Sequence, residues 1–185
     1  MAVPVKNLKR THTEPSLKAA LLRLMKVKPF AKITIKELCE EAGVYRSTFY
    51  CHYANTEELL AAIQNEILAV ADKAYDGLVS KRLSPVGYTT ELLEYVKSGK
   101  YDWTVLLGNY GKEADEFRAK FVSHITEQFS GLLADVGSAF DREYISVYLV
   151  AGSLNIVSKW VENGCDAAIV DIANLIVRLS EKLAN

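Results

Sequence analysis

Arg46 begins a short polar stretch, Arg46-Ser47-Thr48, and its side chain is suited to reading a base of a nucleic acid. The guanidinium fork of arginine can donate two hydrogen bonds to O6 and N7 of guanine, a pairing worth about 1 to 3 kcal/mol of discrimination. A contact from the same fork to a backbone phosphate is the close alternative. Either contact needs elements that hold Arg46 on an exposed surface, and the flanking sequence predicts such elements.

The stretch before Arg46 predicts a short helix with both ends defined. Thr34 and Glu37 have the spacing of a capping box, in which the threonine oxygen accepts from a free amide and the glutamate reaches back. The helix runs to Ala42 and ends at Gly43, because glycine best adopts the left-handed conformation that ends a helix. Only a tight turn then precedes the next helix.

That next helix is predicted from Arg46 to Tyr53, with its polar residues facing outward. Phe49 and Tyr53, spaced i, i+4, form an inward face together with Val44. A helix, a glycine turn and a helix with a polar outer face form a helix-turn-helix.

A third helix begins with the same capping pattern and is much longer. Asn55 and Glu58 mark its start, and apolar residues continue at helical spacing toward Leu78. One long helix is therefore expected to leave the first domain and enter a second, so that it can carry a displacement from one to the other.

Four short elements stand at fixed offsets along this stretch: Ile33-Thr34, Ala42-Gly43-Val44, Thr48-Phe49-Tyr50 and Glu57-Glu58-Leu59. With these elements the region from about Leu17 to Ile67 resembles the DNA-binding domain of the TetR family of bacterial transcriptional regulators. The run RSTFYCHY is similar to a subgroup common in Firmicutes.

The resemblance implies a set of DNA contacts around Arg46, each with an alternative as a surface or capping residue. In the matching helix, the residues implied to contact bases, methyl groups or phosphates are Ser47, Thr48, Tyr50, Cys51 and His52. In the preceding helix, Thr34 and Lys36 are implied to contact the DNA backbone. Two further positions of the set depart from the family pattern. Tyr45 replaces the usual capping Ser or Asn, and Thr56 replaces a phosphate-binding lysine, which implies a weaker anchor there.

Charge is divided unevenly along the 185 residues. Residues 1–60 carry ten Lys and Arg against six Asp and Glu, whereas residues 61–185 carry twelve against seventeen. We therefore expect a DNA-binding domain at 1–60 and a helical effector and dimerisation domain at 61–185. Residues 1–12 are expected to be a mobile basic arm that either lies along DNA or is simply a frayed terminus, with the first helix starting at Thr13 to Pro15.

Several classes of protein are excluded. No run of about 18 apolar residues and no signal peptide is present, so a cytoplasmic location is expected. Cys39, Cys51 and Cys165 form no C-x-x-C pair, so we expect reduced thiols and neither a disulfide nor a metal. The sequence lacks a phosphate loop, a nucleophile elbow and clustered histidines, so neither an enzyme nor a cofactor is expected.

The fold class predicted from apolar periodicity is all-α, with about nine helices. The three helices of the first domain and the long helix are followed by five more, punctuated by glycines. They are expected at Pro85 to Ser98, Tyr101 to Leu107, Lys112 to Val136, Asp141 to Glu162 and Asp166 to Leu183.

The last two helices are the least polar, which suggests an interface. The resemblance implies that they pair with their twin in a two-fold dimer, and a short recognition helix needs such pairing on a palindrome. The expected dimer residues are Gly152, Ile156, Trp160, Ile172, Ile176 and Leu179. For Gly152, a tight spot inside the protomer is the alternative.

The second domain is expected to hold an effector, although the ligand itself cannot be inferred. Aromatic residues in segments that line the cavity in relatives are Tyr75, Tyr88, Trp103, Tyr110, Phe117, Phe121 and Tyr148, with core packing as their alternative role. We thus expect a regulator, a repressor in the first instance, that binds palindromic double-stranded DNA as a homodimer and is released by an effector. Regulation by a protein partner, or by oxidation of Cys51, is the alternative; a closed core would favour the partner and a cavity the ligand.

Overall fold

The computed structural model describes residues 5–107, 111–130 and 137–184, and this part of the chain forms helices and no strand. The predicted all-α class is therefore confirmed. The helices are α1 (Val5–Val27), the short 3-10 helix η1 (Phe30–Lys32), α2 (Ile35–Ala42), α3 (Arg46–Tyr50), α4 (Thr56–Val79), α5 (Pro85–Lys97), α6 (Trp103–Leu107), α7 (Lys112–Ser130), α8 (Ala139–Glu162) and α9 (Ile169–Ala184).

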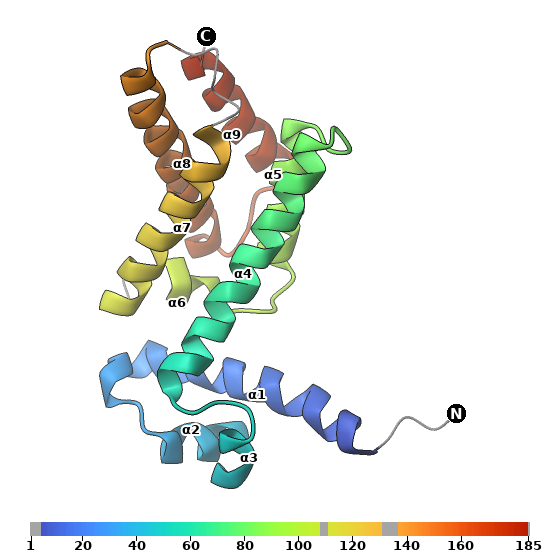
Figure 1. Ribbon diagram of the computed structural model, residues 1–185, viewed down its shortest axis with the longest axis vertical. Helices are drawn as coiled ribbons and strands as arrows, with labels where there is room; N and C mark the ends of the chain where they lie inside the picture. Colours follow the sequence, from blue (N-terminus) through green and yellow to red (C-terminus); the bar gives the residue numbers. More distant parts are fainter. Residues whose placement is uncertain (1–4, 108–110, 131–136, 185) are drawn as a thin grey trace.

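The helices form two groups joined by one long element (Figure 1). Helices α1 to α3, which we call the head, lie at one end, and α5 to α9, which we call the body, lie at the other. Helix α4 starts in the head, with the Asn55 side chain accepting from the Glu58 amide at 2.8 Å, and runs on along the body (Figure 1). The predicted helix shared by both parts is present. Within the described residues no helix is long and apolar enough to cross a membrane.

The caps in the head follow the sequence signals. Thr34 and Glu37 form the complete capping box of α2, and Gly43 ends that helix in the left-handed conformation with φ +67°. Helix α3 is shorter than expected, because it ends at Tyr50 and not at Tyr53. The extended backbone that Asn55 needs as an N-cap forces the chain to leave helical geometry before that residue.

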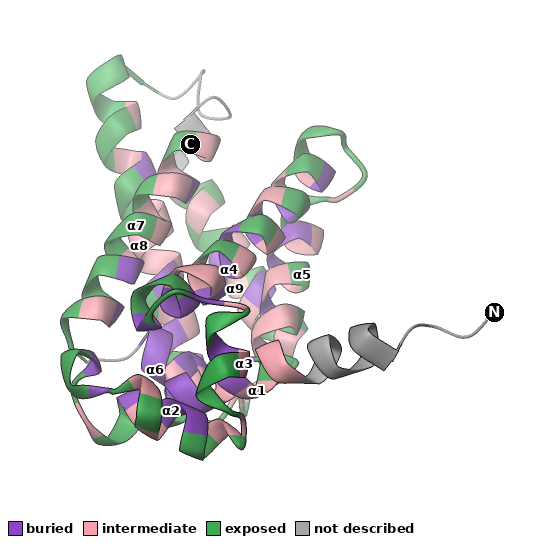
Figure 2. Ribbon diagram, turned by 60° about the horizontal axis from the view of Figure 1, so that its bottom comes forward, coloured by how far each residue is buried: buried purple, intermediate pink, exposed green. Residues whose placement is uncertain are grey.

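One apolar core holds the head together and continues into α4. Its members from α1 to α4 include fully buried side chains, and purple segments face one another there in Figure 2. These side chains, all at 0% exposure, are Leu17, Leu21, Leu38, Phe49, Leu59 and Ile63. Burying a side chain of this size contributes about 1.5 to 3 kcal/mol, so this core fixes α3 against the other helices.

The start of α1 differs from the expectation. The helix begins at Val5, so residues 5–12 are helical in place of an unstructured arm, and residues 1–4 lie outside the described part. Pro15 lies inside the helix, where it lacks one backbone donor, and it does not mark the start. Lysine, arginine and leucine before it are good helix formers, which accounts for the longer helix.

In the body, α5 packs against α9 and α7 against α8. Ser84 caps α5 with Pro85 at its start, as predicted, and Ser138 caps α8 with Asp141 in a second capping box. Helix α8 therefore begins at Ala139, slightly before the expected Asp141. The end predicted for α7, Val136, falls outside the described residues.

Candidate nucleic-acid interface and effector cavity

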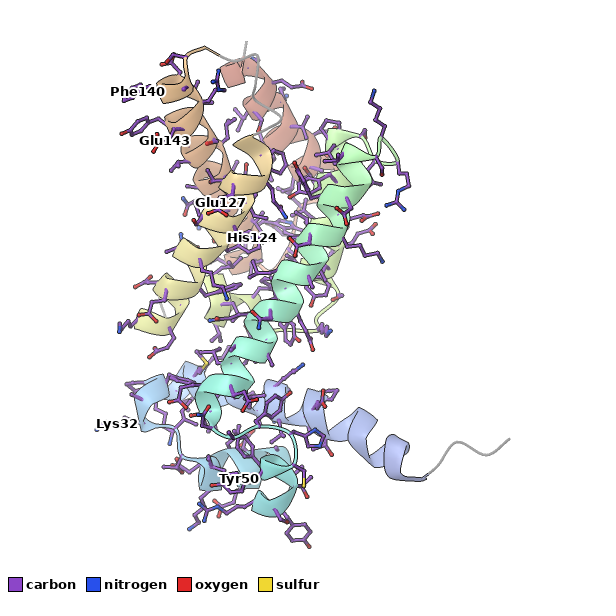
Figure 3. The ribbon with its side chains drawn as sticks, viewed as in Figure 1. Lys32, Tyr50, His124, Glu127, Phe140 and Glu143 are labelled. Carbon is purple, nitrogen blue, oxygen red and sulfur yellow. The ribbon has the colours of Figure 1, made fainter. Side chains whose placement is uncertain are left out.

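The end of the head farthest from the body carries an exposed polar and aromatic surface. Tyr45 and Tyr50 are 83% and 54% exposed although both are large aromatics, and Figure 3 shows Tyr50 at this end. Arg46 and Ser47, between them, are also exposed, and Arg46 makes no ion pair with the described part of the chain. Unpaired donors and aromatic edges on one short helix are groups that can meet bases and phosphates.

The remaining expected contacts of this surface differ in exposure. Cys51 is exposed beside Tyr50, Thr48 is half-buried, and Thr34 and Lys36 are exposed on α2 and at its cap. Lys36 has its Nζ 3.9 Å from Oε1 of Glu40, a loose pair that leaves the ammonium available. These residues form a surface that we call the α3 surface: Thr34, Lys36, Tyr45, Arg46, Ser47, Thr48, Tyr50 and Cys51.

Two residues expected to contact DNA lie in other environments. The His52 side chain is only 7% exposed, and its Nδ1 lies 3.0 Å from Oε1 of Glu14 on α1. Thr56 is buried at the start of α4, where its hydroxyl donates to Oε2 of Glu57 at 3.2 Å. Both side chains bond to other residues of the protein itself, so they are left out of the α3 surface.

A polar joint connects the head to the body. Glu66 of α4 accepts from Nζ of Lys18, a buried residue of α1, and from the hydroxyl of Tyr101 just before α6. The Lys100 ammonium lies 3.1 Å from Oε2 of Glu66. We call Lys18, Glu66, Lys100 and Tyr101 the Glu66 joint.

The joint leads to a prediction about pH. Burial opposes the charge on Glu66, but the hydrogen bonds from its three donors outweigh it and lower the pKa to about 2 from the ordinary 4.5. Because the folded pKa is below the unfolded one, the joint stabilises fully above about pH 4.5 and loses this effect as pH falls toward 2. The Glu66→Gln variant is therefore expected to lose less stability than wild type between about pH 5 and pH 3. Thermal unfolding at a series of pH values measures this difference.

The control for that measurement is Glu40→Gln, which neutralises an exposed carboxylate of α2. Its stability should fall with pH in parallel with wild type, because an exposed carboxylate contributes little to folding. Parallel curves for wild type and Glu66→Gln would contradict the role of the joint.

The body contains a cavity of about 630 Å³, within the range of small-molecule sites. Helices α4, α5, α7, α8 and α9 supply most of its wall, with two residues of α6. Ile67 and Val79 of α4 both line it, so it extends about 18 Å along that helix at 1.5 Å per residue. Most lining side chains are apolar.

The cavity opens at one end. Among its lining residues the exposed ones are Val79, Lys81, Pro85 and Glu181, which gather where α4 ends, α5 begins and α9 ends. The opposite end, formed by Tyr95 and the α6 residues Trp103 and Leu107, lies toward the head, because α6 is next to it in Figure 1. The two charged lining residues are both at the open end, so no charged residue lines the deep end.

Only some of the aromatic residues that were expected to line the cavity do so. Tyr88, Trp103, Phe117 and Phe121 line the cavity. Tyr75 is not among the lining residues, since its hydroxyl donates to the Gln128 carbonyl at 2.6 Å, and Tyr148 is 66% exposed on the outside of α8. Tyr110 falls outside the described residues.

Several lining residues of α5 were not predicted from the sequence. Leu92, Tyr95 and Val96 follow Tyr88 at spacings i+4, i+7 and i+8, and all four line the cavity from one face of the helix. That spacing was the available signal, but it is equally the signal of an ordinary core helix.

The outer face of α8 carries the largest exposed apolar side chains of the body. They recur at helical spacing and are Phe140, Tyr144, Val147 and Tyr148, exposed at 67%, 60%, 45% and 66%. Figure 3 shows Phe140 on the side of α8 away from α4, and its ring centroid is 4.6 Å from that of Tyr144. Such a stripe marks an interaction surface.

The expected dimer residues follow this face only in part. Leu179 of α9 is 42% exposed, and Gly152, Ile156 and Ile172 are half-buried. Trp160 and Ile176 are only 2% and 7% exposed, because they pack inside the protomer. These two residues are therefore not part of the exposed face, contrary to the expectation. The indole of Trp160 donates to the Ala167 carbonyl at 3.0 Å, and Ile176 lines the cavity.

The chain's three cysteines are free thiols, and the described residues contain no group of three side chains that could hold a metal. Cys51 is the exposed thiol. Its neighbour His52, which could assist its ionisation, has its Nδ1 directed to Glu14. This arrangement does not favour a redox role for Cys51.

Comparisons with known proteins agree with this arrangement. A family model described as bacterial regulatory proteins of the tetR family matches residues 17–63, and one described as a transcriptional regulator C-terminal region matches residues 85–182. The second match alone covers more than half of the chain. The chain belongs to the TetR family. It is a DNA-binding transcriptional regulator and not an enzyme.

Individual TetR-family relatives are distant. The regulator EthR of Mycolicibacterium smegmatis is 32% identical over 66 residues, a match that spans 36% of this chain and 30% of that protein. Among solved structures, a TetR regulator from Streptococcus agalactiae is similar with TM-score 0.66 and 18% identity, over 95% of this chain and 97% of that one. The dihydroxyacetone kinase operon activator DhaS has TM-score 0.60 and 18% identity over 92% and 94%. FadR of Thermus thermophilus, solved with lauroyl-CoA, has TM-score 0.53 and 18% identity over 90% and 92%.

Proposed function

We propose that this TetR-family regulator is a cytoplasmic repressor that binds a palindromic operator as a homodimer and is released by an apolar small molecule. The observation that carries the effector part is the cavity of about 630 Å³ in the body. A closed core would have favoured a protein partner as the signal, whereas an apolar cavity of this size favours a ligand.

The proposed DNA contacts are those of the α3 surface. Arg46 is assigned to a base and Lys36 to a phosphate, while the exposed rings of Tyr45 and Tyr50 flank them. One α3 helix spans only a few base pairs. Two heads related by a two-fold axis reach major grooves about 34 to 36 Å apart, which gives the length of a palindrome.

The proposed dimer is formed through the outer face of α8. Phe140, Tyr144, Val147 and Tyr148 give this face an apolar stripe, and a second copy would cover it symmetrically. Leu179 at the end of α9 extends the apolar area.

Ligand binding reaches the head along two proposed routes. Helix α4 lines the cavity from Ile67 to Val79 and enters the head, so a tilt of α4 moves α3. The Glu66 joint and the ion pair of Lys26 with Asp102 connect α1 to the segment before α6, whose Trp103 also lines the cavity. A ligand shifts operator affinity only by its different affinity for the two arrangements, typically about 1 to 3 kcal/mol.

The proposal is tested by filling the cavity. Val150→Trp places an indole where a half-buried α8 side chain lines the wall, and Val27→Trp, at a position 76% exposed in the head, is the matched control. We expect Val150→Trp to bind the apolar dye Nile red at least about tenfold more weakly than wild type or the control. Equal dye affinity in all three proteins would place the ligand elsewhere.

A further inference from the structure

We propose that the ligand of this cavity is an elongated apolar molecule carrying one neutral oxygen acceptor, and that this oxygen binds Trp103 Nε1 and Tyr95 Oη at the deep end. The inference rests on the proposed function, because it specifies the ligand of the same cavity. It starts from two polar atoms that the fold buries without a partner.

Trp103 Nε1 and Tyr95 Oη are buried and have no partner at hydrogen-bonding distance within the part of the chain that the structure describes, although the Lys100 ammonium lies beside Tyr95. Both residues line the cavity, and Trp103 is only 7% exposed. Buried donors are rarely left unpaired, because an unpaired donor loses its hydrogen bonds to water and gains none in return. Two of them at one end of an apolar cavity point to a partner that binds there.

Besides Tyr88 and Ser153, which also line the cavity, three hydroxyl side chains of the wall are already bonded. Thr89 donates to the Pro85 carbonyl at 3.0 Å, Ser146 to the Glu143 carbonyl at 2.9 Å and Ser180 to the Ile176 carbonyl at 3.0 Å. Each of these bonds returns to the backbone of its own helix. The deep pair is therefore chemically distinct from these hydroxyls.

The chemistry of the two groups selects the ligand atom. An indole N–H donates and cannot accept, so its partner must be an acceptor, and a tyrosine hydroxyl can also donate. No charged residue lines the deep end, and the Lys100 ammonium beside Tyr95 is already paired with Glu66. Burying an unpaired anion there would be costly, which favours a carbonyl or ether oxygen over a carboxylate. The apolar wall, about 18 Å long, takes the remaining chain.

The position of this pair also relates ligand binding to the Glu66 joint. The ring of Tyr95 contacts those of Trp103 and Tyr101, with centroids 5.8 and 6.4 Å apart, and Tyr101 donates to Glu66. Both polar atoms are buried, so an oxygen reaches them when the rings turn toward the cavity. That turn disturbs the ring next to the joint.

The test measures how well small molecules with hydrocarbon chains of equal length displace Nile red from the full-length protein. The molecules differ only in the polar group that they carry. We expect methyl nonyl ketone to bind about fivefold to tenfold more tightly than undecane, as one net hydrogen bond allows, and undecylamine, whose ammonium only donates, to bind no better than undecane. In the double variant Trp103→Phe with Tyr95→Phe, the ketone preference should fall to about twofold or less, with undecane affinity retained.

Matched controls remove the same groups outside the cavity wall. Trp160→Phe removes an indole that donates to Ala167, and Tyr75→Phe removes a hydroxyl that donates to Gln128, so both should keep the full ketone preference. An unchanged preference in the deep-end double variant would overturn the inference, as would tighter binding of undecanoate than of the ketone. If none of the four ligands displaces the dye from wild-type protein, the proposal that the cavity binds an apolar molecule is wrong. That outcome differs from a loss of the ketone preference alone.

Discussion

Arg46→Ala is expected to weaken binding to the cognate operator by about 1 to 3 kcal/mol per half-site, and to flatten base preference at one position in each half-site. The reason is the loss of a bidentate fork from the exposed α3 surface, where Arg46 has no ion pair within the described chain. The measurement is fluorescence anisotropy with the operator and with single-position variants of it.

Lys36→Ala is the matched comparison, because it removes one cation from α2 without touching α3. It is expected to weaken binding to every DNA sequence by a similar factor. The slope of log K against log salt should also become shallower, by about 0.9 for each phosphate that the variant no longer neutralises. If both variants reduce only sequence-independent affinity, Arg46 contacts a phosphate and the base-reading role is wrong.

Replacing Tyr144 and Tyr148 together with Glu is expected to dissociate the proposed dimer and, through this, to lower operator affinity by about 100-fold or more. The two rings are 60% and 66% exposed on the outer face of α8, so the charges should leave the protomer folded. In a dimer the second half-site is bound at a high effective concentration, and a monomer does not have that advantage.

Sedimentation at micromolar concentration measures the oligomeric state, and circular dichroism checks the fold. Ala69→Glu, at an exposed position of α4, is the control and should remain dimeric. A wild-type protein that sediments as a single 20.6 kDa species would contradict the dimer. So would a double variant that remains dimeric.

The sequence predicted best what is decided locally. The capping box of Thr34 with Glu37, the left-handed Gly43 and the Asn55 cap lie within a few residues of the groups they bond, so spacing alone revealed them. The length of α1 was predicted wrongly, because Pro15 was interpreted as a start although the helix continues through it.

Features that depend on packing could be predicted only in part. Apolar periodicity identified α8 and α9, but it does not tell which of two apolar faces is turned inward, so Trp160 was assigned outward and Tyr148 inward, the reverse of what is found. Glu66 and Lys18 are 48 residues apart, and no local pattern connects them. The unpaired indole of Trp103 likewise results from the neighbours that the fold supplies.

Occupancy of the body's cavity is proposed to control DNA binding by the head. The most direct test measures the anisotropy of a labelled operator duplex, chosen by selection from random sequences, with wild-type protein and with methyl nonyl ketone at a concentration that displaces Nile red. We expect the ketone to lower operator affinity by about 5-fold to 150-fold, the range of typical coupling energies, and to leave Val150→Trp unaffected. Unchanged operator affinity in wild type with a filled cavity would contradict the account.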